Sequence, residues 1–271
     1  MTTKPTALFA IDGDEVVPTE LSRGPWDPRA CHGGPIGALL ARAVEHTDGG
    51  DVEWQLSRIT VELTRPVPLE PLHLSTALVR PGRKVNLVEA ALTRVADGVE
   101  VARCRALRIR RDPIDLPDDP LSAPEEPFAD LSTASGGATR FPTDLTAFHV
   151  DGAELRFSEG TFMDSGPAKV WIRLQVPVVD GEEPSGVQRV MAAADFGNGV
   201  SGALPHERFR YINPDLTVHL LRPPAGEWIG MDSRSHYGPL GAGLAESALY
   251  DAAGRIGRSV QSLLIDEWEG R

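Results

Sequence analysis

Two stretches of the chain decide the fold, because each repeats the other. Residues 59–67 read ITVELTRPV and residues 216–224 read LTVHLLRPP. Eight residues of the first half recur 157 positions later in the second half. In the first half they are Thr60, Val61, Leu63, Arg65, Pro66, Glu89, Ala91 and Leu92. In the second half the same residue types are Thr217, Val218, Leu220, Arg222, Pro223, Glu246, Ala248 and Leu249. Ile109 recurs as Ile265 after the loss of one residue. An offset held over so long a stretch predicts a duplicated domain.

Each copy predicts one helix followed by long strands. Apolar residues at helical spacing fill residues 34–46 in the first copy and 185–203 in the second. Segments with strand patterns follow at 54–64, 72–79, 85–95 and 99–110, and at 216–221, 228–236, 244–250 and 256–265. The predicted class is α+β, with each half a long central helix wrapped by an antiparallel sheet.

An acidic, proline-rich segment separates the copies. Residues 112–130 contain seven acids, no bases and five prolines. Proline cannot donate to a sheet ladder and like charges repel, so this segment predicts an exposed linker. We therefore divide the chain into an N-terminal domain at 1–111, a linker at 112–140 and a C-terminal domain at 141–271.

Composition excludes several classes of protein. With 27 basic and 39 acidic residues, the net charge is −12, which disfavours binding to nucleic acid or to an anionic membrane. Cys31 and Cys104 are the two cysteines, too few for a disulfide scaffold. The start of the chain lacks a signal-peptide pattern, and no apolar run is long enough for a membrane span. We expect a cytoplasmic protein without a metal or other cofactor, since the seven histidines include no HxxxH pair.

The helix-and-strand pattern, with these sequence words in it, resembles a double hotdog protein of the acyl-CoA thioesterase II (TesB-like) family. The resemblance rests on HGGPIGALLARAVE at 32–45, Ala193-Ala194-Asp195, the strand at 215–223 and Ser259-Val260-Gln261. It implies hydrolysis of acyl-CoA to a fatty acid and CoA. It also implies further assembly, to a homodimer or a larger homo-oligomer.

The resemblance also implies a catalytic trio of aspartate, threonine and glutamine that holds the attacking water. By position the aspartate is Asp195 and the glutamine is Gln261, while Asn213 stands where the family has threonine. A carboxylate can take the proton of a water as general base, and two polar groups can fix that water. The first copy has no aspartate at the matching helix position, and it has Arg105 at the offset of Gln261. One catalytic set per chain, in the second copy, is therefore expected.

Each residue of the trio also has an ordinary structural interpretation. Asp195 could cap a helix or make a local hydrogen bond, Gln261 could face solvent from a strand, and Asn213 before Pro214 could mark a turn. Gly197, Gly199 and Gly202 spell GxGxxG, but no apolar strand precedes them, so a dinucleotide site is not expected. No GxSxG nucleophile motif occurs.

Two other functions remain open from the sequence. One is a non-catalytic binder of acyl-CoA or an acyl-carrier thioester, in which Asn213 signals lost activity. The other is an enoyl-CoA hydratase, because Asp27 and His32 have the spacing of the acid/base pair in hotdog hydratases, although their neighbours differ from that signature.

Substrate contacts are expected from the start of the first helix and from basic residues. His32, Gly33 and Gly34 precede or open that helix, where His32 could line the cleft or cap the helix. For the coenzyme phosphates, one candidate group is Arg80, Arg83 and Lys84. The rival group is Arg103, Arg105, Arg108 and Arg110, on a strand where a change of alternation after Ala106 predicts a bulge.

Overall fold

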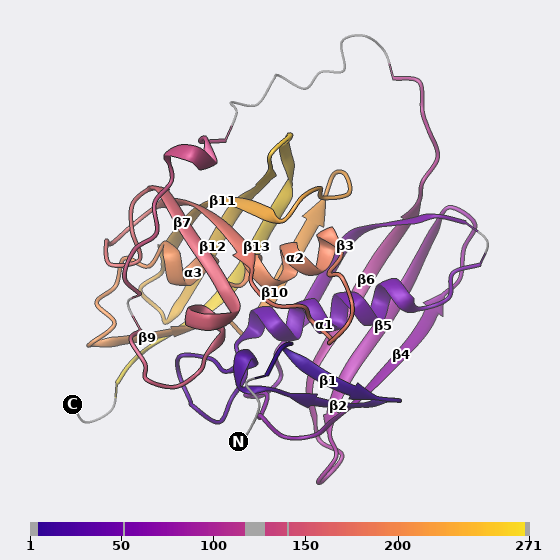
Figure 1. The fold of residues 1–271 in the computed structure, drawn as a ribbon, viewed down its shortest axis with the longest axis horizontal. Coiled ribbons are helices and arrows are strands. Elements are labelled where there is room, and N and C mark those ends of the chain that lie inside the picture. The colour runs from indigo at the N-terminus through magenta and orange to yellow at the C-terminus, as the bar shows by residue number, and fades with distance from the viewer. Residues whose placement is uncertain (1–4, 51, 117–127, 140, 269–271) are drawn as a thin grey trace.

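The computed structural model describes residues 5–50, 52–116, 128–139 and 141–268. Long antiparallel strands form one sheet, and two helices lie against it side by side (Figure 1). The strands are β1 (Phe9–Asp12), β2 (Glu15–Pro18), β3 (Trp54–Glu62), β4 (Leu72–Arg80), β5 (Val85–Arg94), β6 (Glu100–Arg110), β7 (Ala153–Glu159), β8 (Ala168–Leu174), β9 (Phe209–Ile212), β10 (Asp215–Leu220), β11 (Trp228–Tyr237), β12 (Ala242–Asp251) and β13 (Gly254–Glu267).

The two repeated stretches meet in the middle of this sheet. The strand order is β1-β2-β4-β5-β6-β3-β10-β13-β12-β11-β8-β7, with β9 paired to β13. At the β3–β10 join, Thr60 lies opposite Thr217, and their hydroxyl oxygens are 3.1 Å apart. Outward from the join, the order β3-β6-β5-β4 in the first half matches the order β10-β13-β12-β11 in the second. The eight predicted strands are present with ends shifted by at most two residues, whereas β1, β2, β7, β8 and β9 were not predicted.

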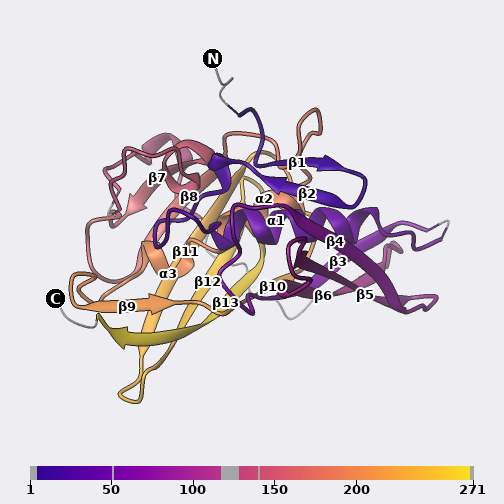
Figure 2. The same ribbon diagram turned by 90° about the horizontal axis from the view of Figure 1, so that it is seen from below.

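Helix α1 (Gly33–His46) is the predicted first helix, and it is buried on nearly every side. It packs against helix α2 (Gly186–Ala194) and the inner face of the sheet, and the β1–β2 hairpin lies beside it (Figure 2). His32 is its N-cap residue, and Thr47 ends it. Shorter helical turns occur at Glu20–Ser22, Leu131–Thr133 and Phe148–Gly152.

The second predicted helix, 185–203, is wrong as one continuous element. It divides into α2 and a short helix α3 (Gly197–Val200), with Asp195 and Phe196 between them. The side chain of Gln261 on β13 causes the break. Its Oε1 accepts from the Asn198 backbone N–H at 3.0 Å, and its Nε2 donates to the Asp195 carbonyl at 3.3 Å. A side chain inserted into the helical hydrogen-bond ladder interrupts it.

Strand β6 continues its alternation past Ala106, so the predicted bulge in it is wrong. The register shift lies in the partner strand, between Leu56 and Arg58 of β3. Arg108 consequently points inward and is only 4% exposed, while Ile109 faces out. The pairing of β3 with β6 and of β10 with β13 also changes which residue of the first half matches Gln261. Thr60 pairs with Arg105 and Thr217 with Val260, so the register neighbour that matches Gln261 is Ala106 and not Arg105.

The predicted linker is only partly described, because residues 117–127 and 140 lie outside the described residues. Residues 112–116 form no helix or strand. Phe128 packs on the sheet of the second half, stacked on Tyr250 with ring centroids 4.7 Å apart and edge-on to Trp171. Gly230 makes room for this ring, because a Cβ there would lie 2.6 Å from it. The end of the linker is therefore anchored on the C-terminal half.

Candidate active site

A cavity of about 480 Å³ opens where the start of α1 meets the end of α2. Its wall is mainly apolar, and its polar groups include His32, Asp195, Asn198 and Asn213. Its other lining residues include Trp26, Ile36, Leu63, Ile212, Leu264 and Trp268. An apolar cavity with a few convergent polar groups is the usual form of a small-molecule site.

Asp195 is the centre of the polar groups and is 6% exposed. Its Oδ2 lies 2.9 Å from His32 Nδ1. Its Oδ1 accepts from Asn213 Nδ2 at 2.8 Å and from Gln261 Nε2 at 3.3 Å. The backbone N–H of Gly34 donates to His32 Nδ1 at 3.1 Å and also stabilises this carboxylate. Residues from both halves of the chain therefore hold a single buried acid.

The surroundings of Asp195 keep it ionised. Burial acts to raise its pKa, but hydrogen bonds and charge from His32, with hydrogen bonds from Asn213 and Gly34, outweigh burial and lower the pKa below its ordinary value. The carboxylate also lies at the N-terminal end of α1, where the helix dipole favours negative charge. The site thus holds a stable anion inside an apolar cavity.

Of the two amide residues, only Asn213 lines the cavity. It follows β9 and is joined to β10 by Pro214 alone, so the two strands fix its position. Gln261 is 1% exposed and lies behind Asp195, which excludes the solvent-facing alternative. Sequence reasoning missed Asn198, whose side chain donates to Asn213 Oδ1 at 3.4 Å. In the sequence, the only indication of a role for Asn198 is its position three residues after Asp195.

Glycine at position 33 permits the approach of the two helices. A Cβ at Gly33 would lie 2.7 Å from Asp195 Oδ2. Gly197, at the start of α3, has the same relation to Gln261, whose Oε1 would lie 2.9 Å from a Cβ there. The GxGxxG pattern therefore has a packing reason at its first glycine.

The other predicted substrate contacts divide into two groups. His32 and Gly33 line the cavity, and Gly34 is buried beneath them. Arg80, Arg83 and Lys84 are exposed around the β4–β5 turn and are not among the residues that line the cavity. The basic residues that line it are Arg65 and Arg210, which the sequence analysis missed. Arg210 pairs with Asp266 at 2.8 Å.

The rival arginines and Asp27 also have other partners. Arg103 pairs with Glu100 and Arg105 with Glu89 on the outer face of the sheet, and Arg110 pairs with Asp112. Asp27 lines the cavity, but its carboxylate pairs with Arg29 at 3.1 Å. The acid that His32 contacts is Asp195.

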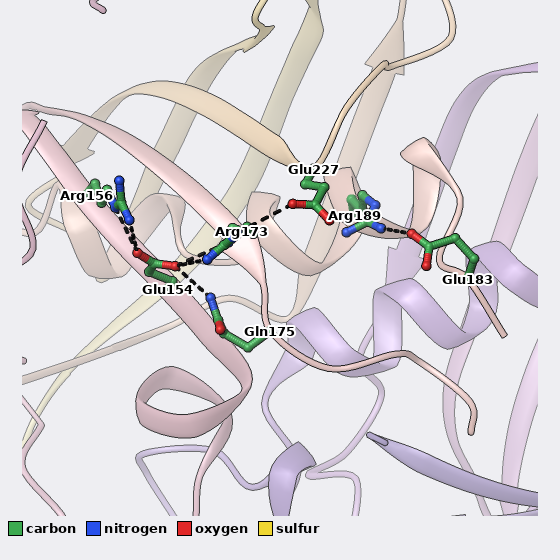
Figure 3. Close-up of polar contacts among 7 residues, drawn as sticks. All are labelled: Glu154, Arg156, Arg173, Gln175, Glu183, Arg189 and Glu227. Carbon is green, nitrogen blue, oxygen red and sulfur yellow. Dashed lines mark hydrogen bonds and ion pairs between the residues drawn. The ribbon is translucent and has the colours of Figure 1, made fainter. Parts of the chain in front are cut away.

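A second charged cluster, away from the cavity, is satisfied by its own members (Figure 3). Glu154 on β7 accepts from Arg156, Arg173 and Gln175 at 2.7–2.8 Å. Arg156 and Arg173 also stack on the Trp228 ring, at 4.8 and 4.9 Å from its centroid. We assign this cluster a structural role at the β7–β8 edge.

Two further properties of the described residues bear on the class of protein. None of their helices is long and apolar enough to cross a membrane. Within the same residues, no three His, Cys, Asp or Glu side chains are grouped as metal ligands.

An antiparallel sheet against two helices, with a buried carboxylate where the helices meet, defines a hotdog-fold protein with a candidate hydrolytic site. Solved structures with this fold include a hot dog protein from Alicyclobacillus acidocaldarius, at 15% identity, 97% and 96% coverage of this and that chain and a TM-score of 0.71. Another is the acyl-CoA thioesterase II TesB2 of Mycobacterium marinum, at 16% identity, 96% coverage of both chains and a TM-score of 0.60.

Family models then identify the chain. The model of the acyl-CoA thioesterase N-terminal domain matches residues 22–109, and that of the acyl-CoA thioesterase C-terminal domain matches residues 117–265. The chain belongs to the TesB-like acyl-CoA thioesterase family, and it is a thioester hydrolase. No curated protein sequence matches it.

Proposed function

We propose that the chain hydrolyses acyl-CoA to a fatty acid and CoA in the cavity at the start of α1. The observation that carries this proposal is the Asp195 carboxylate, which is kept ionised in an apolar cavity by donors from both halves of the chain. A buried charge of this kind strengthens the electrostatic activation of a water. The acyl chain would lie against the apolar wall, and Arg65 or Arg210 could meet the coenzyme phosphates.

The catalytic set of this proposal is Asp195, Asn213 and Gln261. Asn213 reaches both the cavity and the carboxylate, so it can hold the water beside Asp195. Gln261 holds the chain break that presents Asp195, and it acts from behind the carboxylate. Asn213 supplies a donor to Asp195, as a threonine hydroxyl would, so Asn213→Thr is expected to retain activity within about tenfold.

We also propose the finer architecture. The mirrored strand order and the facing Thr60 and Thr217 support two hotdog domains in tandem, at 1–111 and 141–271, with 112–140 as the linker. Assembly to a homodimer or a larger homo-oligomer and a cytoplasmic location are part of the same proposal.

The test is release of free thiol from a panel of acyl-CoAs, from acetyl to palmitoyl, with Asp195→Ala measured in parallel. We expect release by the wild type that the variant loses by a factor of about 10³, with the unfolding midpoint little changed. Binding of acyl-CoA without release would instead indicate a binding protein. Consumption of an enoyl-CoA, measured by absorbance, would indicate a hydratase.

A further inference from the structure

We propose that Asn198 is a further catalytic residue, whose side-chain oxygen Oδ1 accepts one hydrogen of the attacking water while the other hydrogen faces Asp195. The inference rests on the proposed acyl-CoA hydrolysis and gives its water a second fixed contact. It follows from the place of Asn198 on the cavity wall and from the hydrogen bonds that the neighbouring amides already make.

Asn198 projects from the same side of the broken helix as Asp195. Asp195 and Phe196, which join α2 to α3, both have helical backbone angles. Residues three apart on a helical backbone are neighbours on its surface, so the side chain of Asn198 lies beside that of Asp195. Both residues line the cavity. The helix break therefore brings a carboxylate and an amide to the same wall.

Asn213 also lines the cavity, but both of its amide hydrogens are bonded. Its Nδ2 donates to Asp195 Oδ1 at 2.8 Å and to the Asp215 carbonyl oxygen at 3.3 Å. An ionised carboxylate can only accept, so Asn213 has to turn Nδ2 toward Asp195 and Oδ1 away from it. On that other side, Oδ1 accepts from Asn198 Nδ2 at 3.4 Å. The charge of Asp195 thus fixes the orientation of both asparagine amides.

This orientation leaves the side-chain oxygen of Asn198 free. Within the described residues, Asn198 Oδ1 accepts no hydrogen bond, and it is not among the polar atoms sealed from solvent. Asn198 is only 7% exposed, so the space that this oxygen faces is the cavity. An amide oxygen without a partner in a largely apolar cavity is a strong acceptor for a water.

Gln261 lies too deep to make this contact. It is 1% exposed and is not among the residues that line the cavity. Its Oε1 accepts from the Asn198 backbone N–H at 3.0 Å, and its Nε2 donates to Asp195 Oδ1 at 3.3 Å. Gln261 and Asn213 therefore hold the water through the two residues that they both bond, Asp195 and Asn198.

The proposed step balances. With its hydrogens directed to Asp195 and Asn198, the water turns a lone pair toward the thioester carbonyl carbon. As the new C–O bond forms, the C=O electron pair moves onto the carbonyl oxygen and the first proton passes to Asp195. When the tetrahedral intermediate collapses, the C–S bond breaks and this proton passes to the departing thiolate. The second hydrogen stays on the oxygen, and the products are the carboxylic acid and CoA thiol.

The decisive variant is Asn198→Leu in the full chain, with decanoyl-CoA as the probe. Leucine has a similar size and branching but no acceptor, and the backbone N–H that binds Gln261 is kept. Since one of two contacts to the water is lost, we expect kcat to fall by about 10²-fold, with KM within about threefold of wild type. A kcat within about threefold of wild type overturns the inference.

The matched control is Ser201→Ala. Ser201 ends α3, is 1% exposed and is not among the residues that line the cavity. We expect Ser201→Ala to keep kcat within about twofold of wild type. An equal loss of kcat in Ser201→Ala and Asn198→Leu would show that any disturbance of α3 lowers the rate, which would also overturn the inference.

A second background separates contact with the water from an effect through Asn213. In Asn213→Thr, a hydroxyl donates to Asp195, and no amide remains for Asn198 to orient. We expect Asn198→Leu to cost about 10²-fold in kcat in this background as well. A loss that disappears in the Asn213→Thr background would mean that Asn198 only orients Asn213, and would contradict the proposed contact.

Failure of the inference is distinguishable from failure of the proposed function. If the wild type releases no thiol from any acyl-CoA, the proposed function fails and the inference fails with it. If the wild type releases thiol and Asn198→Leu does so at a similar rate, only the inference fails.

Discussion

Where the start of α1 meets the end of α2, the N-cap residue His32 contacts Asp195. Where the start of α2 meets the end of α1, the N-cap residue Ser185 donates to Glu45 at 2.8 Å, and Gln188 donates to the same carboxylate at 3.0 Å. Both crossings have a cavity, of about 480 Å³ at the first and about 530 Å³ at the second. Both crossings thus place a carboxylate beside a helix N-cap, buried at Asp195 and partly exposed at Glu45.

The two carboxylates nevertheless differ in the direction of their pKa shifts. Burial raises the pKa of Glu45, since its hydrogen bonds from Gln188 and Ser185 are outweighed. At Asp195 the imidazole of His32 and the amide of Asn213 reverse the effect of burial, and the pKa is lowered. The ionised form is therefore stabilised at Asp195 and destabilised at Glu45, although the two helix crossings have similar geometry. The difference supports one catalytic set per chain.

The largest expected effect comes from removing the charge at the first crossing. Asp195→Asn keeps the size of the side chain but loses the anion, so kcat should fall by about 10³- to 10⁴-fold. Thiol release under saturating acyl-CoA measures it. The matched control is Glu45→Gln at the second crossing, which should leave kcat within about twofold. A large loss in both variants would contradict a single catalytic set.

Truncation of Gln261 tests the helix break. Gln261→Ala leaves the backbone N–H of Asn198 and the backbone carbonyl of Asp195 without their Gln261 partner. We therefore expect the free energy of unfolding to fall by about 2 kcal/mol and kcat to fall by about 10²-fold. Chemical denaturation and thiol release measure the two effects. Gln188→Ala, which removes the amide beside Glu45, should lower stability by about 1 kcal/mol and leave kcat unchanged.

The order and type of the main strands could be predicted from the sequence, because the internal repeat and the alternation of apolar residues are local signals. The inward Arg108 could not, since alternation analysis assumes that a charged residue faces solvent. The helix break could not either, because it depends on Gln261, which is 66 residues from Asp195 in the chain. Tertiary hydrogen bonds override helical periodicity at this position.

The candidate site shows the same limit. Asp195, Asn213 and Gln261 could be named from the order of short motifs, and the structure brings them together. The contact of His32 with Asp195 joins residues 163 positions apart, and no spacing rule connects them. Spacing instead suggested Asp27 as the partner of His32, but Asp27 lies beside Arg29, two residues away. Short-range patterns thus found the residues and missed the pairing.

A smaller effect is expected from the first residue of each helix. Gly33→Ala would place a Cβ 2.7–2.9 Å from the Asp195 carboxyl group and displace it, so kcat should fall by about tenfold or more. Gly186→Ala would place a Cβ against the Pro224 carbonyl oxygen, far from Asp195, and should lower stability by about 1–3 kcal/mol without changing kcat. Equal losses of kcat in the two variants would mean that the glycines matter only for folding.

The smallest effect is the pH dependence of stability at the second crossing. Because folding raises the pKa of Glu45, the protonated acid is favoured in the folded state, and its stabilisation is full below the unfolded pKa and is lost as pH rises through the folded pKa. Glu45→Gln should therefore match wild type near pH 4 and be more stable by about 0.5–1 kcal/mol at pH 8. Thermal unfolding of both proteins between these pH values measures the difference. A variant less stable than wild type at pH 8 would show that the bonds from Ser185 and Gln188 outweigh burial, and the contrast with Asp195 would then rest on His32 alone.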